Sequence, residues 1–196
     1  MKAAAESLAT RAERRKRATE ARLLDAALDV FCAHGYDAAT TGAMARAADV
    51  AAGTFYLHFR DKRAAYEHLA RRAAHDLLER WRAAIRPAMG VAERVALGLR
   101  LAADYWRADP RRARLLLEGG PSFGSDGHLR FVDEIAAALA SGARRRRVLP
   151  TRSLALLVAG LGIEVGRLVV ARPDAPEVDE LIRLVRRSLA HLDLAP

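Results

Sequence analysis

Apolar residues recur along most of the chain at intervals of three and four positions, the spacing of a helix face that packs against a core. Leu24, Leu28 and Phe31 follow this spacing, and Gly35 supplies the stop signal that ends their segment near His34. Alanine, leucine and arginine dominate the composition, and β-branched residues are few. The chain is therefore predicted to be all-α.

Two short helices are predicted after this first one. The earlier begins at Thr40, whose hydroxyl can cap exposed backbone N–H groups, and ends near Ala48. Asp49 makes the turn, and the next helix covers residues 51–60 with Phe55 and Phe59 one turn apart on its inner face. Three short helices with a tight turn before the last describe a helix-turn-helix unit.

The rest of the chain is predicted to be helical as well. A longer helix begins near Asp61, which can serve as its cap, and ends at Pro87. The segment from Leu154 to Val170 is apolar nearly all round, so we expect it to be buried on both sides or packed in a subunit interface. The helices expected beyond Gly90 are Val91–Ala108, Arg111–Glu118, Gly127–Ala140, Thr151–Ala171 and Glu177–Leu192.

The charge of the chain indicates the class of its binding partner, and its cysteine content indicates its cellular compartment. The formal net charge of +9 favours a polyanionic partner, with nucleic acid ahead of an anionic membrane surface. Residues 1–19 lack apolar periodicity and are predicted to be a solvated basic arm. Cys32 is the single cysteine, the first residues do not form a signal-peptide core, and the longest apolar run is about half of the roughly 20 residues that span a bilayer. We expect a cytoplasmic protein without a membrane partner.

Residues 20–66 contain the words LLDAALDVFCAHGYDAATTGAMARAADV and GTFYLHFRDKRAAY. They join an amphipathic helix, a Gly-Tyr, a Thr-Thr and the pattern Gly-Thr-aromatic-Tyr-x-His-Phe-x-x-Lys. This stretch closely resembles the N-terminal DNA-binding domain of the TetR family of transcriptional regulators. The resemblance implies a basic arm at residues 1–19, a helix-turn-helix DNA-binding domain at 20–63, and a helical effector-binding and dimerisation domain at 64–196.

The resemblance also implies which residues meet DNA. Hydroxyl and ammonium donors suit phosphate oxygens, Gly53 lets the backbone approach the duplex, and Ala52 and Leu57 can contact thymine methyl groups. The residues expected to contact DNA are Thr40, Thr41, Ala52, Gly53, Thr54, Tyr56, Leu57, His58 and Lys62.

Three departures from the family pattern reduce the expected number of direct contacts. Ala51 and Ala52 replace a common Ser-Lys pair, which removes a helix cap and a phosphate contact. Asp49 replaces the usual turn glycine, and Asp tolerates the left-handed conformation that this turn needs. Gly42 stands where relatives often have a base-reading side chain. The basic arm can compensate for these losses.

The same resemblance implies a homodimeric repressor that leaves a palindromic operator when a small molecule binds, with neither cofactor nor enzymatic activity. Small residues recur along the penultimate helix at i, i+4, i+7 and i+11, a stripe that permits close helix approach. We expect the last two helices to form the dimer. The residues expected in the interface are Ala155, Ala159, Gly162, Gly166, Leu181, Val185, Ser188 and Leu192.

An aromatic cluster marks the expected effector site, which lies beside a glycine-rich loop able to move. The cluster comprises Tyr105, Trp106, Phe123, His128 and Phe131. We expect an apolar or aromatic ligand with His128 or Tyr105 as its polar anchor. Ordinary core packing of the same residues is the alternative.

Two further functions stay open on sequence grounds: a DNA-binding protein that needs no ligand, and a helical enzyme acting on a small molecule. Residues 120–124 match G-x-S-x-G, but the preceding segment is helical and no sheet exists to carry a triad around Ser122. His68 and His75 share a helix face with Glu79, which is less convergence than a metal site needs. The sequence thus favours a DNA-binding regulator.

Overall fold

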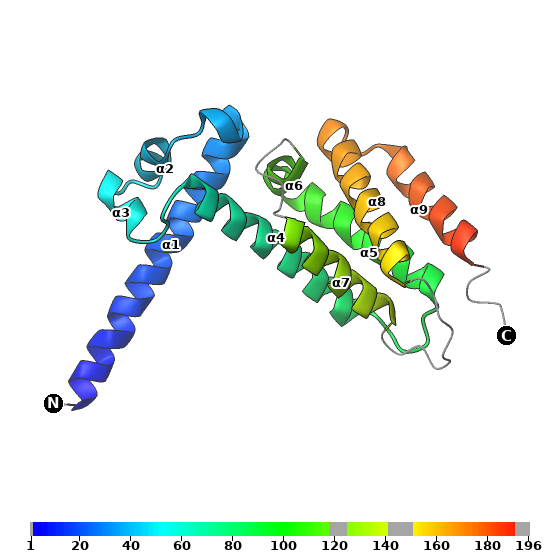
Figure 1. Ribbon diagram of the computed structural model, residues 1–196, viewed down its shortest axis with the longest axis horizontal. Helices are drawn as coiled ribbons and strands as arrows, with labels where there is room; N and C mark the ends of the chain where they lie inside the picture. Colours follow the sequence, from blue (N-terminus) through cyan, green and yellow to red (C-terminus); the bar gives the residue numbers. More distant parts are fainter. Residues whose placement is uncertain (1, 118–124, 141–150, 191–196) are drawn as a thin grey trace. The chain divides into compact units, whose positions relative to one another are not determined.

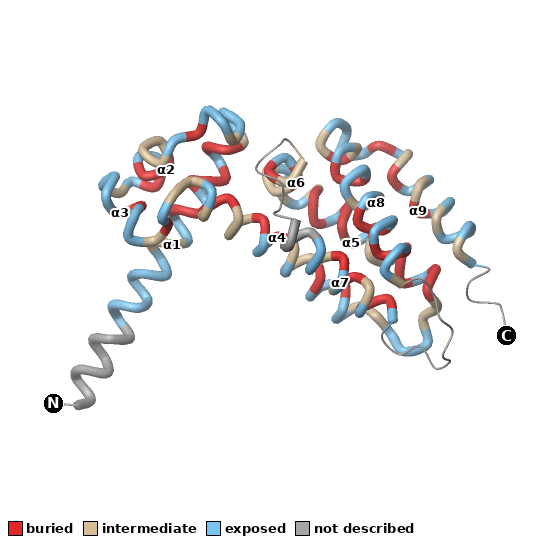
Figure 2. Tube along the Cα trace, in the orientation of Figure 1, coloured by how far each residue is buried: buried red, intermediate tan, exposed pale blue. Residues whose placement is uncertain are grey.

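The computed structural model describes residues 2–117, 125–140 and 151–190 (Figure 1). Within these ranges all regular elements are α-helices, with no strand, which confirms the predicted fold class. The chain divides into two compact units, and the boundary after Leu69 falls inside one long helix. Each unit buries its own set of apolar side chains (Figure 2).

The first unit is a small helical domain. It contains α1 (Lys2–Ala38), α2 (Thr41–Ala47), α3 (Ala52–Tyr56) and the start of α4 (Lys62–Ala84). Gly35 has a φ of 73° and breaks the helical geometry of α1, as its predicted role as a stop signal requires. Leu23, Met44 and Phe55 are fully buried, and Phe59 packs beside Phe55 as expected.

The N-terminal residues differ from the prediction because α1 already begins at Lys2. Alanine, glutamate and arginine have high helix propensity even where no apolar stripe is present, so the helix extends past the last core contact. The side chains from Arg11 to Arg17 are exposed, and the basic segment is a solvated helix rather than an irregular arm.

The second unit is a helical bundle built around α5 and α8. Its helices after α4 are α5 (Val91–Ala108), α6 (Pro110–Leu117), α7 (Ser125–Ala140), α8 (Thr151–Ala171) and α9 (Pro176–Leu189). α5 packs against α8 and α9, while α6 and α7 also pack against α8. Arg94 is buried, and its guanidinium donates to the carbonyl oxygens of Met89, Ala138 and Leu139, so it satisfies the last carbonyls of α7.

α8 is the most apolar helix of the described chain and is long enough to cross a membrane by length and composition. One face is core: Ala155, Val165 and Val169 are fully buried against neighbouring helices. The opposite face exposes Leu156 and Leu157. The chain itself therefore buries only one side of this helix, and the subunit interface expected for the other side stays a prediction.

Candidate functional site

The turn between α2 and α3 is fixed by its own backbone and by α1. The Thr40 hydroxyl accepts a hydrogen bond from the Ala43 N–H at 3.1 Å, so Thr40 caps α2 as predicted. Asp49 has a φ of 52°, the left-handed conformation expected of this position. Arg22 of α1 donates to the carbonyl oxygens of Ala48 and Asp49. These contacts hold α3 at a defined angle to α2.

α3 exposes two large side chains on the side away from its buried Phe55. Tyr56 is 59% exposed and Leu57, the residue that ends the helix, is 77% exposed. The hydroxyl groups of Tyr56 and Thr41 lie 2.9 Å apart and form a hydrogen bond between α3 and α2. We call the exposed face around these three residues the recognition surface. Its other members are the exposed Thr40, Ala52 and Gly53 and the half-buried Thr54.

No side chain caps the start of α3, where Ala51 stands, in agreement with the predicted loss of a cap. The recognition surface therefore offers hydroxyl groups, an exposed stretch of backbone and one apolar side chain. Hydroxyls and backbone N–H groups donate to phosphate oxygens, and an exposed leucine suits thymine methyl groups. This combination can bind the groove of a DNA duplex.

His58 does not belong to the recognition surface, which corrects the prediction that it faces DNA. Its side chain is 6% exposed, and its Nδ1 lies 3.8 Å from the Glu20 carboxylate of α1. The physical reason is the length of α3: the helix ends at Tyr56 instead of continuing to residue 60. Helical periodicity consequently misplaces the residues that follow, and His58 turns inward beside Phe59.

Lys62 also differs from its predicted role as a phosphate contact. Its ammonium donates to the carbonyl oxygens of Tyr36 at 2.8 Å, Asp37 at 2.8 Å and Ala39 at 3.2 Å. An ammonium has three N–H donors, so all of them are used inside the protein. The charge also lies 4.7 Å from the centre of the Tyr36 ring. Lys62 therefore satisfies the backbone carbonyl groups at the end of α1 and stabilises the fold.

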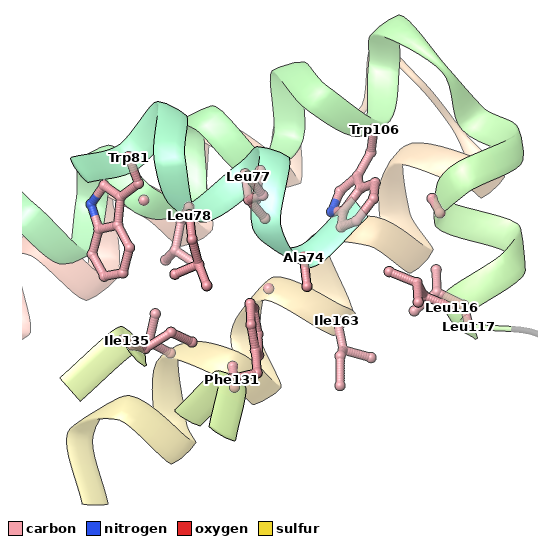
Figure 3. Close-up of a pocket in the computed structure, with 17 residues that line it drawn as sticks. Ala74, Leu77, Leu78, Trp81, Trp106, Leu116, Leu117, Phe131, Ile135 and Ile163 are labelled. Carbon is pink, nitrogen blue, oxygen red and sulfur yellow. The ribbon is translucent and has the colours of Figure 1, made fainter. Parts of the chain in front are cut away.

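A cavity of about 160 Å³ lies within the second unit (Figure 3). Figure 3 shows Trp81 and Trp106 well apart, with Leu77 and Ala74 of α4 between them and Phe131 and Ile163 across the space. The residues that line it are Ala74, Leu77, Leu78 and Trp81 of α4; Gly98, Leu99, Ala102 and Trp106 of α5; Ala113, Leu116 and Leu117 of α6; Phe131 and Ile135 of α7; and Val158, Ala159, Gly162 and Ile163 of α8.

No charged side chain is among these lining residues, and apart from the two indole N–H groups their side chains are hydrocarbon. An engineered cavity of about 150 Å³ with a Leu, Ile and Phe lining stays dry and binds benzene. The cavity of this chain is similar in size and has an apolar lining, which suits a small apolar molecule.

The predicted effector residues are only partly assembled around this cavity. Trp106 and Phe131 line it. Tyr105 does not: it is buried elsewhere, its hydroxyl accepts from the Arg112 guanidinium at 2.8 Å, and burial raises the pKa of Tyr105 although that guanidinium lowers it. Phe123 lies outside the described residues. His128 lies in α7, but its side chain is outside the described part of the chain.

The small-residue stripe of α8 points into the chain, so its predicted role in the dimer is wrong for its buried members. Ala155 and Ala159 are buried, and a Cβ added to Gly166 would lie 3.2 Å from Leu117. Gly162 lines the cavity. Small residues do mark a close approach, but the approaching elements are helices of the same chain.

The last helix keeps some of its expected exposure. Ser188 is exposed, Leu181 and Val185 are half-buried, and Leu192 lies outside the described residues. The sequence reasoning missed Leu184, which is 60% exposed beside them. It also missed the α4 wall of the cavity, where Leu77 and Trp81 lie one turn apart.

Comparisons with known proteins agree with this geometry. Residues 23–69 match the family described as bacterial regulatory proteins, tetR family. A comparison with curated proteins found no match.

Solved structures similar to the chain extend over most of its length. A TetR-family transcriptional regulator from Streptomyces coelicolor is 26% identical, with 90% of this chain and 99% of that chain covered and a TM-score of 0.69. The fatty acid degradation regulator FadR from Bacillus halodurans is 24% identical, with 86% and 96% covered and a TM-score of 0.68. FadR from Bacillus subtilis, solved in complex with stearoyl-CoA, is 22% identical, with 86% and 96% covered and a TM-score of 0.67.

Proposed function

The chain belongs to the TetR family of transcriptional regulators, and we propose that it is a repressor that binds a palindromic operator as a homodimer and leaves it when an apolar small molecule enters the cavity. Regulators of this family are transcription factors and not enzymes, and they bind operator DNA and form dimers. In this proposal residues 1–19 form a basic helical arm in the cytoplasm, 20–63 bind DNA, and 64–196 bind the effector and the partner chain.

One observation carries the proposal: the chain combines an exposed recognition surface with an apolar cavity. α4 contributes to both units, because Lys62 at its start holds the end of α1 while Ala74, Leu77 and Trp81 line the cavity. A ligand that displaces the middle of this helix therefore acts on an element that the DNA-binding unit also uses. A coupling free energy of about 1–3 kcal/mol is typical of such regulation.

The proposed DNA contacts are those of the recognition surface, namely Thr40, Thr41, Ala52, Gly53, Thr54, Tyr56 and Leu57, without His58 and Lys62. An operator is first selected from a pool of random duplexes. Replacing Tyr56 and Leu57 together by Ala should then weaken binding by at least tenfold, because disturbing the recognition of one base pair in a specific site typically costs about 1–3 kcal/mol. Leu129→Ala, at an exposed leucine of α7, is the matched control. Wild-type affinity in the folded double variant would refute the assignment.

The dimer requires a different face from the one predicted by the small-residue stripe. A palindromic operator needs two recognition helices, hence two chains. The exposed sides of α8 and α9 offer Leu156, Gly160 and Leu184, with Ser188 beside them. Exposed apolar side chains gathered on neighbouring helices favour a protein interface. We assign the partner contact to this face.

Two glycines of α8 separate the dimer proposal from the effector proposal. Gly160 is exposed and Gly162 lines the cavity, and a Cβ on either would meet nothing within 4 Å. Gly160→Arg should give a folded monomer by light scattering, since the charge enters the partner contact. Gly162→Leu should leave a dimer that binds operator but no longer responds to ligand, because the new side chain fills the cavity. The reverse pattern would show that the two faces are exchanged.

The lining of the cavity supports the proposed effector class. One similar structure holds stearoyl-CoA, and two are FadR proteins, so acyl chains are one candidate within the apolar class. Likeness at this level of identity shows the fold, so the proposal rests on the hydrocarbon lining and extends to apolar molecules in general. To test this proposal, fluorescence anisotropy of labelled operator DNA is measured as an apolar molecule is added. The proposal predicts that the protein releases the operator. Operator binding that no apolar compound alters would favour the ligand-independent alternative.

A further inference from the structure

The two tryptophans of the chain both line the cavity but differ in their hydrogen bonds. The Trp81 indole N–H donates to the Arg94 carbonyl oxygen at 3.0 Å. The Trp106 indole N–H is buried and has no hydrogen-bond partner among the residues that the structure describes. Leaving a buried donor unpaired costs free energy that a suitable acceptor recovers, and tryptophan in a protein interior usually finds such an acceptor. Trp106 is therefore a donor without an acceptor in the wall of an apolar cavity.

The described surroundings of Trp106 are apolar. The side chain is 7% exposed, and its Nε1 would lie 3.4 Å from a Cβ added at Gly166. None of the lining side chains that the structure describes carries an oxygen, so these side chains offer the indole no acceptor.

The nitrogen is covered by its neighbours, so an incoming acceptor must displace one of them slightly. Leu117 is one neighbour on this side, because a Cβ added at Gly166 would lie 3.2 Å from the Leu117 Cδ1 and 3.4 Å from the indole nitrogen. Glycine leaves this position without a side chain, and the end of a leucine can change rotamer at low cost. A change of the Leu117 rotamer is therefore the smallest movement that can open a route to the indole N–H.

We propose that the effector is an uncharged apolar molecule with one hydrogen-bond acceptor, such as a ketone or ester oxygen, that receives the N–H of Trp106. This inference rests on the proposed function of the cavity. A carboxylate is disfavoured at this position, since no cation is among the described lining residues and an unpaired buried charge is far more costly than a buried carbonyl. A pure hydrocarbon fits the lining but leaves the indole unpaired.

Acetophenone and ethylbenzene test the proposal because they have nearly the same shape and differ in the carbonyl oxygen. The two indole N–H resonances of the nitrogen-15-labelled protein are assigned with Trp81→Phe. Acetophenone should shift the Trp106 indole proton downfield, as hydrogen bonding does, and ethylbenzene should not. The Trp81 resonance, whose proton is already bonded, serves as the internal reference.

Titration calorimetry of Trp106→Phe gives the second measurement. The substitution keeps an aromatic ring and removes the donor, so acetophenone should bind roughly tenfold more weakly while ethylbenzene stays within about twofold. Trp81→Phe is the matched control and should change the affinity for both compounds alike. Benzoate should bind more weakly than acetophenone to the wild type.

The outcomes distinguish this inference from the function on which it rests. Binding of both compounds with no selective shift at Trp106, or an equal effect of Trp106→Phe on both, would overturn the donor role and leave the cavity as an apolar site. Tighter binding of benzoate would overturn the exclusion of charged ligands. If neither compound bound, the cavity would lose its proposed role as an effector site, and the donor role with it. The resonance shift decides the question even if Trp106→Phe does not fold.

Discussion

Replacing Lys62 by Met removes the ammonium that holds the end of α1 while keeping a long apolar stem. A hydrogen bond from a charged donor is worth about 1.5–3 kcal/mol. Of the three that Lys62 donates, those to Tyr36 and Ala39 are part-buried and that to Asp37 is exposed, so water replaces a large share of each. The contact with the Tyr36 ring adds about 0.5–1 kcal/mol. We expect the first unit to lose about 2 kcal/mol of unfolding free energy.

Hydrogen exchange at core amides of α1 and α2 measures this loss for the first unit alone, without assuming that the whole chain unfolds in one step. Binding to a generic DNA duplex gives the second measurement. The slope of log K against log salt should stay at its wild-type value, whereas a lost phosphate contact would lower it by about 0.9 per chain. Arg46→Met, at an exposed residue of α2, is the charge-matched control. Unchanged exchange together with a lower slope would refute the structural role of Lys62.

Three further predictions concern stability. Gly98→Ala should lower the melting temperature by the equivalent of about 1–3 kcal/mol, because the new Cβ would lie 2.9 Å from the Trp81 ring. Asp49→Gly should stabilise the first unit by up to about 1 kcal/mol, because glycine adopts a φ of 52° without strain, and hydrogen exchange at core amides of that unit checks this. Burial raises the pKa of Asp109, but hydrogen bonds and charge from Arg111 outweigh it and hold that pKa below its usual value. Asp109 therefore stabilises the folded protein at pH values above the ordinary carboxyl pKa, and this stabilisation is lost as the pH falls through the lowered pKa of the folded state. The melting temperature of the wild type should show this loss, and that of Asp109→Asn should not.

The sequence predicted local structure well where one residue decides it. Thr40 was predicted to cap a helix, Gly35 to end one and Asp49 to adopt a left-handed conformation, and the structure shows all three. Each of these is a property of a side chain and its nearest backbone neighbours. The bounds of α5 and α8 also matched, because turn signals enclose long apolar patterns.

The functional side chains were harder to place because their partners are distant in sequence. The ammonium of Lys62 binds carbonyls 23 to 26 positions earlier in the chain. His58 was assigned by extending a helix that ends at Tyr56. Periodicity places a residue on a face, but it does not identify the neighbour on that face. Gly162 accordingly suggested a partner chain although it lines a cavity.

The helices that line the cavity differ in whether they also support the DNA-binding unit, and this difference matters for converting the protein into a sensor for another compound. α4 supplies one wall and also carries, at its first residue, the lysine that secures the DNA-binding unit. Substitutions in α4 can therefore change both the stability of the DNA-binding unit and the ligand specificity, so a library that randomises α4 would select for the two properties together. Phe131 and Gly162 line the same space from α7 and α8, which lie wholly within the second unit. Diversity introduced at these two positions should reshape ligand preference while operator affinity stays intact.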